Sequence, residues 1–253
     1  MLRADGQPKL VLGKRGNGHW VYFNTQDNTD NGTIIDFMVN RGLTFADIRD
    51  RFAPSQTTAP QAAASFRDTW KAAKPHPAPP WLISRGITAH TLKTTRPTIR
   101  CDRNGRVLFA HRDRHRSLTG FEIAPPDGPR RFATGGTRAL CAIHAATQAA
   151  SLRALVVTES GLDALSIAQL EHCPPDHAFL STAGAPSRSQ CAQIQHAANI
   201  LPNLEALVLA QDGDEAGDRQ GEAIRKAVVL PDHVRLERRR PPDSMDWNDI
   251  VRE

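Results

Sequence analysis

The spacing of hydrophobic and polar positions changes along the chain, and the first segment with its own spacing is residues 1–52. Two β-rich runs in "KLVLGKRGNGHWVYFNT" flank a Gly-Asn-Gly segment, which is typical of a hairpin. Helical spacing follows over 33–42 and again over 44–52. We therefore predict a small N-terminal unit of one hairpin and two short helices.

The composition changes at 53–80, where six prolines are interleaved with alanines. This composition is typical of an exposed linker, here with one helical stretch around 62–73. From 81 to 152, short apolar runs alternate with turn residues, as in "TIRCDRNGRVLFAHRD" and "LTGFEIAPPDGPRRF". We predict a mixed α+β subdomain there.

Residues 153–253 alternate between apolar runs and helical patterns. The runs "ALVVT", "AFLS" and "ALVLA" are continuously apolar, as in strands buried on both faces of a parallel sheet. Each run is followed by a segment with helical spacing, and "HVRLERR" indicates one more strand. The pattern predicts an α/β domain with a mostly parallel sheet and flanking helices.

Composition narrows the cellular setting. The chain has no run of about 18 apolar residues and no export signal near Met1, so we expect a cytoplasmic protein without a membrane span. The four cysteines are scattered without a C-x-x-C pair, which favours reduced thiols over disulfides or a zinc site.

Charge is distributed unevenly around the net value of +5. Residues 85–153 carry a net charge of +9, whereas 154–253 carry −7. Two solvated surfaces of opposite sign would explain this asymmetry. The alternative is a face that binds a polyanion beside a site that collects cations.

Acidic residues stand where two of the apolar runs end. Glu159 closes "ALVVTE", and Asp212 closes "ALVLAQD", with Asp214 two residues later. Ligands of open α/β sheets collect at the carboxyl ends of strands, and Asp163 would face the same place from the next helix. Carboxylates that converge there repel one another, and a divalent cation removes that penalty. The sequence therefore predicts a Mg²⁺ or Mn²⁺ site.

The acidic turn after Asp212 is also compatible with two roles besides Mg²⁺ binding. Asp-rich turns are commonly helix N-caps or Asx-turns, and an isolated D-x-D is more often one of these. The segment "DGDEAGDRQGEA" also imitates a calcium loop, but Ala216 and Ala223 stand where that loop needs ligands. We reject the calcium loop.

The ordered motifs "TESGLDALS", "STAG" and "QDGDEAG" resemble the Toprim domain of primases, topoisomerases and certain nucleases. Upstream, "WLISRGITAHTLK", "NGRVLFAHRDRHRSLTGFEIA" and "RFATGGTRALCAI" follow in the order seen in bacterial DnaG-type primases. Arg138 stands where that family usually has a lysine. Downstream, "SMDWNDIV" resembles a late metal-site motif in which Asp246 matches an acid and Asn248 replaces one.

The resemblance also covers 31–52 faintly, where the segment is similar to the end of the zinc-binding domain of these primases. No cysteine precedes Cys101, so this unit would be a remnant without zinc. Compact Toprim proteins of this layout occur on plasmids and other mobile elements, which implies a role in plasmid replication or DNA transfer.

What the resemblance implies is a primase-like nucleotidyltransferase that uses single-stranded DNA, NTPs and Mg²⁺. Its metal ligands would be Glu159, Asp212, Asp214 and Asp246, and its further catalytic residues Asp163 and Arg138, with Glu159 as a ligand or general base. The residues expected to follow the DNA backbone are Arg96, Arg100, Arg112, Arg114 and Arg116.

Other functions remain open at this point. The same carboxylates could serve a nuclease, or the protein could be a non-catalytic DNA-binding accessory for a relaxase or helicase. A type IA-like topoisomerase is disfavoured, because its nucleophile is a tyrosine and the only tyrosine is Tyr22, inside the expected hairpin.

Overall fold

A computed structural model describes residues 10–14, 20–27, 29–44, 65–144, 148–242 and 245–253. The chain divides into two compact units, 1–63 and 64–253. Among the described residues, no helix has the length and apolar character needed to cross a membrane.

The first unit is a three-stranded antiparallel sheet in the order β1-β2-β3, followed by helix α1. Its elements are β1 (Leu10–Lys14), β2 (Trp20–Asn24), β3 (Asn31–Thr33) and α1 (Ile34–Val39). Thr33 and Asp36 form a capping box at the start of α1, and Gly42, with φ +80°, lies just beyond its end. The predicted hairpin and first helix are confirmed, whereas the Gly-Asn-Gly turn and the helix predicted over 44–52 lie outside the described residues.

The second unit contains two sheets. The antiparallel sheet has the order β4-β5-β6-β7, and the mostly parallel sheet has the order β12-β11-β9-β10-β8. The first sheet and its helices are α3 (Phe66–Ala72), α4 (Pro80–Ser84), α5 (Ala89–Thr95), β4 (Ile99–Cys101), β5 (Val107–Arg112), β6 (Leu118–Ala124) and β7 (Arg131–Phe132). The remaining elements are β8 (Cys141–His144), a 3₁₀ turn (Ala149–Ser151), β9 (Ala154–Thr158), α6 (Gly161–Leu170), β10 (His177–Ser181), α7 (Arg188–Ile200), β11 (Ala206–Leu209), α8 (Glu215–Ala227), β12 (Arg235–Arg238) and α9 (Trp247–Arg252).

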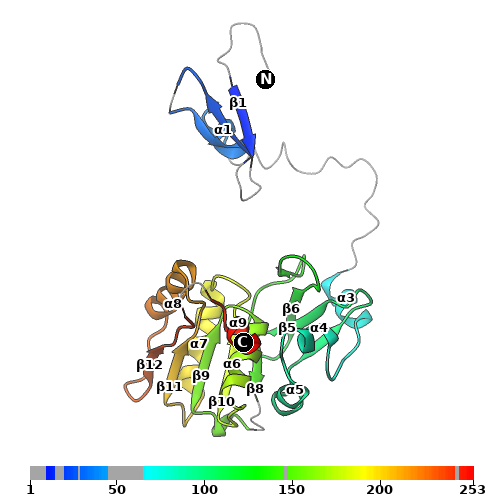
Figure 1. The fold of residues 1–253 in the computed structure, drawn as a ribbon. Coiled ribbons are helices and arrows are strands. Elements are labelled where there is room, and N and C mark those ends of the chain that lie inside the picture. The colour runs from blue at the N-terminus through cyan, green and yellow to red at the C-terminus, as the bar shows by residue number, and fades with distance from the viewer. Residues whose placement is uncertain (1–9, 15–19, 28, 45–64, 145–147, 243–244) are drawn as a thin grey trace. The chain divides into compact units, whose positions relative to one another are not determined.

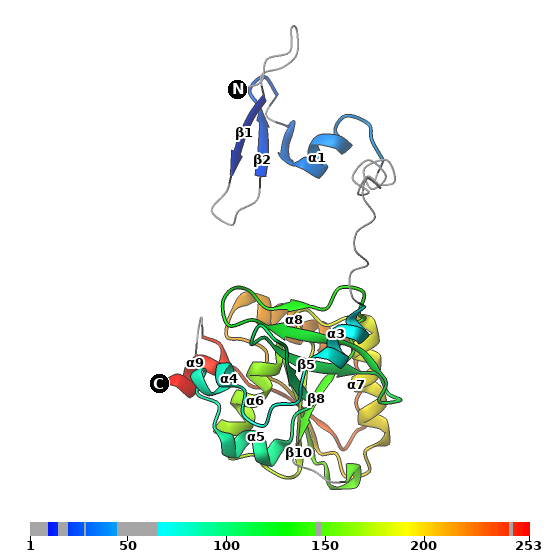
Figure 2. The ribbon, with the colours of Figure 1, turned by 90° about the vertical axis from the view of Figure 1, so that its right-hand side faces the viewer.

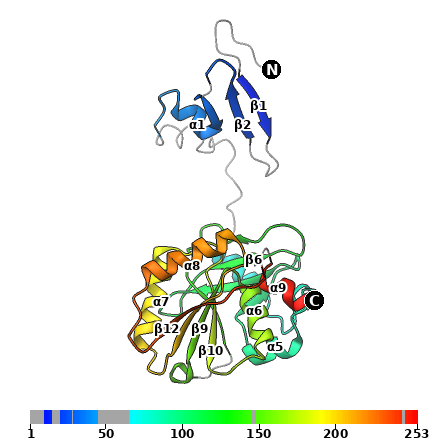
Figure 3. The ribbon, with the colours of Figure 1, turned by 60° about the vertical axis from the view of Figure 1, so that its left-hand side comes forward.

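The mostly parallel sheet is covered on both faces, as its apolar strands predict. Alternation along β9 points Val156 toward α6 and α9, and Leu155 and Val157 toward α7 and α8. Figures 1 and 3 show these helices on the two sides of the strands. The α/β fold with a mostly parallel sheet is therefore confirmed.

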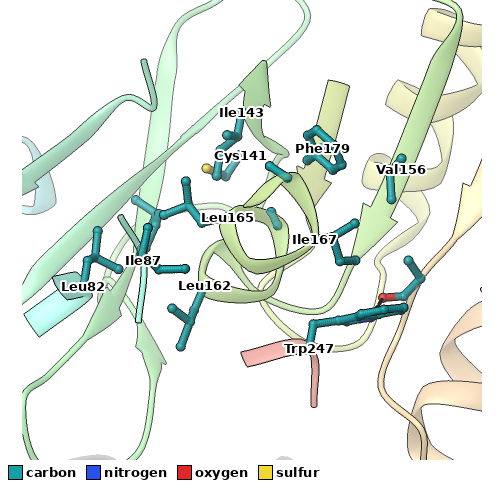
Figure 4. Close-up of a cluster of buried hydrophobic side chains, with 14 of the residues drawn as sticks. Leu82, Ile87, Cys141, Ile143, Val156, Leu162, Leu165, Ile167, Phe179 and Trp247 are labelled. Carbon is teal, nitrogen blue, oxygen red and sulfur yellow. Dashed lines mark hydrogen bonds between the residues drawn. The ribbon is translucent and has the colours of Figure 1, made fainter. Parts of the chain in front are cut away.

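Helix α6 lies at the centre of the larger core. Figure 4 shows its Leu165 beside Ile87 and Cys141, and its Ile167 beside Trp247 of α9. Its N-terminus is capped by Ser160, whose hydroxyl accepts a hydrogen bond from the Asp163 amide. The first three residues of the helix, Gly161, Leu162 and Asp163, are all buried, so this N-terminus is held in place.

Two expected boundaries are corrected by the packing. Residues 65–80 belong to the larger unit and are not an exposed linker, because Trp70 and Ala73 are buried against β5 and β6 (Figure 2). Strand β8, expected within a separate basic subdomain, pairs antiparallel with β10 and completes the other sheet. The proline content predicted an exposed linker, but the apolar side of α3 packs against the antiparallel sheet.

Candidate metal and nucleotide site

The candidate site lies at the carboxyl edge of the parallel sheet. Strands β9 and β11 are parallel neighbours, and Glu159 and Asp212 follow their ends. Asp163 lies in the first turn of α6, and Asp246 caps α9, a helix packed against α6. Four acidic side chains distant in sequence therefore reach one edge.

The backbone around Glu159 is held by the antiparallel sheet. A side chain at Gly161 would meet the Phe109 ring at 2.5 Å, so only glycine permits this approach. The Gly161 amide donates to Glu122 Oε2 at 2.9 Å, and the Ser181 hydroxyl donates to the same oxygen at 3.2 Å. Glu122 thus connects β6 to the ends of β9 and β10.

The turn after Asp212 is packed as tightly. A Cβ at Gly213 would lie 2.4 Å from the Pro242 carbonyl oxygen. The Gly213 amide donates to Met245 O at 3.2 Å, and Arg238 Nη2 donates to Asp212 O at 3.1 Å. These contacts fix the Asp212 backbone without engaging its carboxylate.

Helix α9 brings Asp246 to the edge. The Trp247 indole donates to Ala210 O at 2.8 Å, and Asn248 donates to Arg85 O at 2.8 Å and to the Ser166 hydroxyl at 3.2 Å. Asn248, which stands in place of an acid in the resembling motif, is buried and fastens the helix. The anchoring role of Asn248 was not predicted from the sequence.

The charges of neighbouring acids raise the pKa values of Asp212 and Asp163. Burial raises the pKa of Asp212 well above its usual range, and the charges of Asp163, Glu159 and Asp246 raise it further. Burial likewise raises the pKa of Asp163, with Asp246 and Glu159 adding to the effect. In both cases Arg130 opposes the rise. The edge is therefore short of positive charge.

Two of the acids accept hydrogen bonds from neighbouring side chains. Gln220 Nε2 donates to Glu159 Oε2 at 2.8 Å, and the Ser160 hydroxyl donates to Asp163 Oδ2 at 2.5 Å. One oxygen of Asp163 and one of Asp212, Oδ1 in both, are buried without a hydrogen-bond partner. Buried polar atoms without partners are uncommon, and a bound cation would satisfy both of these oxygens.

These residues fit a hard divalent cation by their chemistry. Carboxylate oxygens are the ligands that Mg²⁺ and Mn²⁺ accept, and two such oxygens here lack partners. As the side chains stand, no three acidic, histidine or cysteine residues of the described segments are arranged to hold a metal ion. Binding would therefore require carboxylates to turn toward the ion.

Asp214 is the most exposed of the predicted ligands, and like Asp246 it caps a helix. Asp214 has φ −114° and ψ 176°, but the chain bends at Gly213 and Asp214, and the exposed Asp214 side chain caps α8. Oδ1 accepts a hydrogen bond from the Gly217 amide at 2.7 Å. The N-cap interpretation thus applies to one oxygen of Asp214, and metal binding by Asp214 stays a prediction.

A small cavity joins the acidic edge to basic residues. Its volume is about 160 Å³, and its lining includes Glu159, Ser160, Arg130, Arg131 and Arg138. Arg138, predicted to meet a phosphate, is therefore brought together with Glu159. A cavity of this size with arginines on its wall suits a single phosphate group.

Sequence reasoning missed Glu122 and Arg130. Glu122 is buried, and burial raises its pKa to about 7, opposed by the Gly161 amide and the charge of Arg130. Arg130 donates to the Ser160 hydroxyl and lies 3.5 Å from Asp163 Oδ2. A lone glutamate inside the apolar strand "GFEIA" was a signal for the first, whereas Arg130 stands in a Pro-Gly segment that predicts only a turn.

The arginines expected to contact DNA have different surroundings. Arg112 and Arg116 line a second cavity of about 680 Å³ whose remaining lining is largely apolar. Arg96 and Arg114 are exposed. Arg100 has a packing role that was not predicted, because it donates to Trp70 O at 2.7 Å and stacks 4.9 Å from that ring. DNA contact by these residues stays a prediction.

Residues 156–251 match the Toprim-like family model. This part of the chain is a Toprim-like domain, and the resemblance stated from "TESGLDALS" and "QDGDEAG" is confirmed.

Solved primase structures are also similar to the chain. One is a DnaG primase catalytic domain bound to single-stranded DNA, with 15% identity, 68% of each chain covered and a TM-score of 0.48. Another comprises the zinc-binding and RNA polymerase domains of the Aquifex aeolicus primase, with 13% identity, coverage of 96% and 77%, and a TM-score of 0.48. The primase fragment of the bacteriophage T7 primase-helicase protein has 19% identity, coverage of 81% and 80%, and a TM-score of 0.45. No curated protein matches the chain by sequence.

Proposed function

We propose that the protein is a primase-like nucleotidyltransferase that makes short RNA on single-stranded DNA and depends on Mg²⁺ or Mn²⁺. The observation that carries this proposal is the meeting of Glu159, Asp163, Asp212 and Asp246 at one sheet edge, with buried carboxylate oxygens that lack partners. Toprim domains generally use such an edge for divalent-metal chemistry on nucleic acids.

In this mechanism Asp212, Asp246 and Glu159 would hold the ion, with the free oxygen of Asp214 as a fourth ligand, and the catalytic residue Asp163 would offer it the Oδ1 that lacks a partner. The ion would orient the incoming triphosphate, lower the pKa of the attacking 3′-hydroxyl and screen the leaving pyrophosphate. Glu159 is also the proposed general base, at whose carboxylate the hydroxyl proton would be held. Glu122 would keep Glu159 in position through the Gly161 amide.

Basic residues would bind the substrates. Arg138 shares the small cavity with Glu159 and would contact the triphosphate or a template phosphate. The exposed arginines Arg96, Arg114 and Arg116 would follow the template backbone together with Arg112, and the affinity would fall steeply with salt. A role in plasmid or mobile-element replication or transfer, beside a helicase or relaxase, completes the proposal.

The test uses the full chain with a single-stranded template, NTPs and Mg²⁺, and follows both RNA and template. We expect short RNA, and its loss in Asp212→Asn and Glu159→Gln by a factor on the order of a hundred to a thousand. Asp232→Asn is the matched control, because Asp232 is an exposed acid outside the site.

Two results would redirect the proposal. Disappearance of the template without RNA synthesis would make the protein a Toprim nuclease. Full function of Asp212→Ala in a plasmid maintenance or transfer test would make it a non-catalytic DNA-binding accessory protein. The topoisomerase alternative has less support still, since Tyr22 is buried and its hydroxyl donates to Asp30 Oδ1 at 2.5 Å.

A further inference from the structure

Arg130 already supplies positive charge to the acidic edge. It precedes β7 in the antiparallel sheet and reaches the first turn of α6, where it lies 3.5 Å from Asp163 Oδ2. The charges of Asp163, Glu122, Asp212 and Glu159 raise the pKa of Arg130 above its usual value, despite its partial burial. The charge of one guanidinium therefore acts on four carboxyl groups.

The neutralisation is incomplete. Arg130 and the Ser160 hydroxyl meet Oδ2 of Asp163, while Oδ1 of this fully buried side chain has no hydrogen-bond partner. A single positive charge also cannot balance Glu159, Asp163, Asp212 and Asp246 together. The site therefore still attracts a further cation, and Oδ1 of Asp163 is the atom that such a cation would contact.

A divalent ion at this edge would enter the same field that holds Arg130. Two cations in one partly desolvated site repel each other, so the free energy of metal binding includes the cost of weakening the arginine contact. The Arg130 side chain is 32% exposed, so it can turn into water without unfolding of the chain around it.

We propose that Arg130 is a resident counter-cation of the acidic edge, which stabilises the metal-free protein and gives way when a divalent metal binds. The inference rests on the proposed metal site and adds a competition between metal and arginine. Compared with a chain that lacks this arginine, the wild-type chain should bind the metal more weakly. In the absence of metal it should be more stable.

Mn²⁺ titration calorimetry on the full chain tests the competition directly. Arg130→Gln removes the charge and should tighten Mn²⁺ binding on the order of tenfold, with a smaller gain at high salt. Arg130→Lys keeps the charge and should stay within about threefold of the wild type. Arg131→Gln is the matched control, because Arg131 lines the same cavity, whereas Arg130 is the arginine that lies 3.5 Å from Asp163 Oδ2.

Hydrogen exchange of the wild-type chain gives a second measurement that does not depend on how the variants fold. Adding Mg²⁺ should speed exchange at the amides of Asp127, Gly128 and Arg130, and should slow exchange at Ser160 and Gly161. Equal or weaker Mn²⁺ binding by Arg130→Gln, or slower exchange in both segments, overturns the competition but leaves the metal site standing. Failure of every variant to bind Mn²⁺ overturns the metal site and the competition with it.

Discussion

Asp30 in the N-terminal unit and Asp212 at the sheet edge show two opposite treatments of the same side chain. Asp30 accepts hydrogen bonds from the Tyr22 hydroxyl at 2.5 Å, Asn24 at 2.9 Å and Arg41 at 3.1 Å, and these donors hold its pKa well below its usual range. Asp212 has a buried oxygen without a partner, and its pKa is raised by burial and by other acids.

The difference separates a structural carboxylate from one available to a ligand. A carboxylate that accepts all its hydrogen bonds from the protein stabilises the fold and has no oxygen left to bind a ligand. A charge held among other charges costs stability, and the protein keeps it only because the neighbouring packing supports it. Replacing each acid by its amide should therefore change stability in opposite directions.

Asp30→Asn should produce the largest structural effect. The loss of the charge weakens hydrogen bonds from the Tyr22 hydroxyl and the Arg41 guanidinium, which connect β2 to the segment before β3 and to the end of α1. We expect hydrogen exchange at Val21 and Phe23 to accelerate about tenfold or more in the full chain. Asp212→Asn is the matched variant, and it should leave these amides unchanged while it raises the melting temperature by a few degrees.

The pH dependence of the first unit follows from the same contacts. Because the folded-state pKa of Asp30 is below its unfolded value, its contribution is present above about pH 4 and is lost as the pH falls further. Unchanged exchange in Asp30→Asn, or a lower melting temperature in Asp212→Asn, would remove the distinction between the two acids.

Glu122→Gln should show the largest effect within the second unit, and it sharpens the comparison there. The pKa of Glu122 is raised from 4.5 to about 7 in the folded protein. A raised pKa means that the wild type has its full stability below about pH 4.5 and loses part of it as the pH rises to 7. The shift corresponds to about 3 kcal/mol.

The amide side chain introduced by Glu122→Gln keeps an oxygen that can accept from Gly161 and carries no charge at any pH. Urea unfolding of both proteins from about pH 4 to 8 should therefore show a flatter profile for Glu122→Gln, with its advantage appearing above about pH 5. Parallel profiles would mean that Glu122 is not the buried titrating group. Glu122→Ala, which also loses the acceptor, should be destabilised throughout this range.

The sequence predicted the parallel sheet well for a physical reason that does not extend to the whole site. Continuous apolar runs such as "ALVVT" report burial on both faces of a strand, and the acids after them are local to the strand ends. Glu122 and Arg130 reach the site from the other sheet, 39 residues before Gly161 and 33 before Asp163. Such contacts depend on how the two sheets pack together. The spacing of hydrophobic residues within one segment does not predict that packing.

Local rules also compete with one another, as Asp214 shows. Asp214 follows Asp212 by two residues, as the D-x-D pattern requires, but the backbone bends at Gly213 and Asp214 and the same residue stands at the start of a helix. Its side chain then satisfies the Gly217 amide. The residue pattern is compatible with both outcomes, and only the position where α8 begins separates them.

Asp214 supplies the smallest and most discriminating effect. Asp214→Ala removes the N-cap and should cost about 1 kcal/mol of unfolding free energy, whereas Asp214→Ser keeps a capping oxygen and should cost a few tenths. Serine also removes the carboxylate oxygen that does not cap the helix. A stable Asp214→Ser protein that loses Mn²⁺ affinity would make Asp214 a ligand and give it both roles. Unchanged Mn²⁺ affinity would place Asp214 beside Asp30 as a structural carboxylate and leave Asp212, Glu159 and Asp246 to hold the metal.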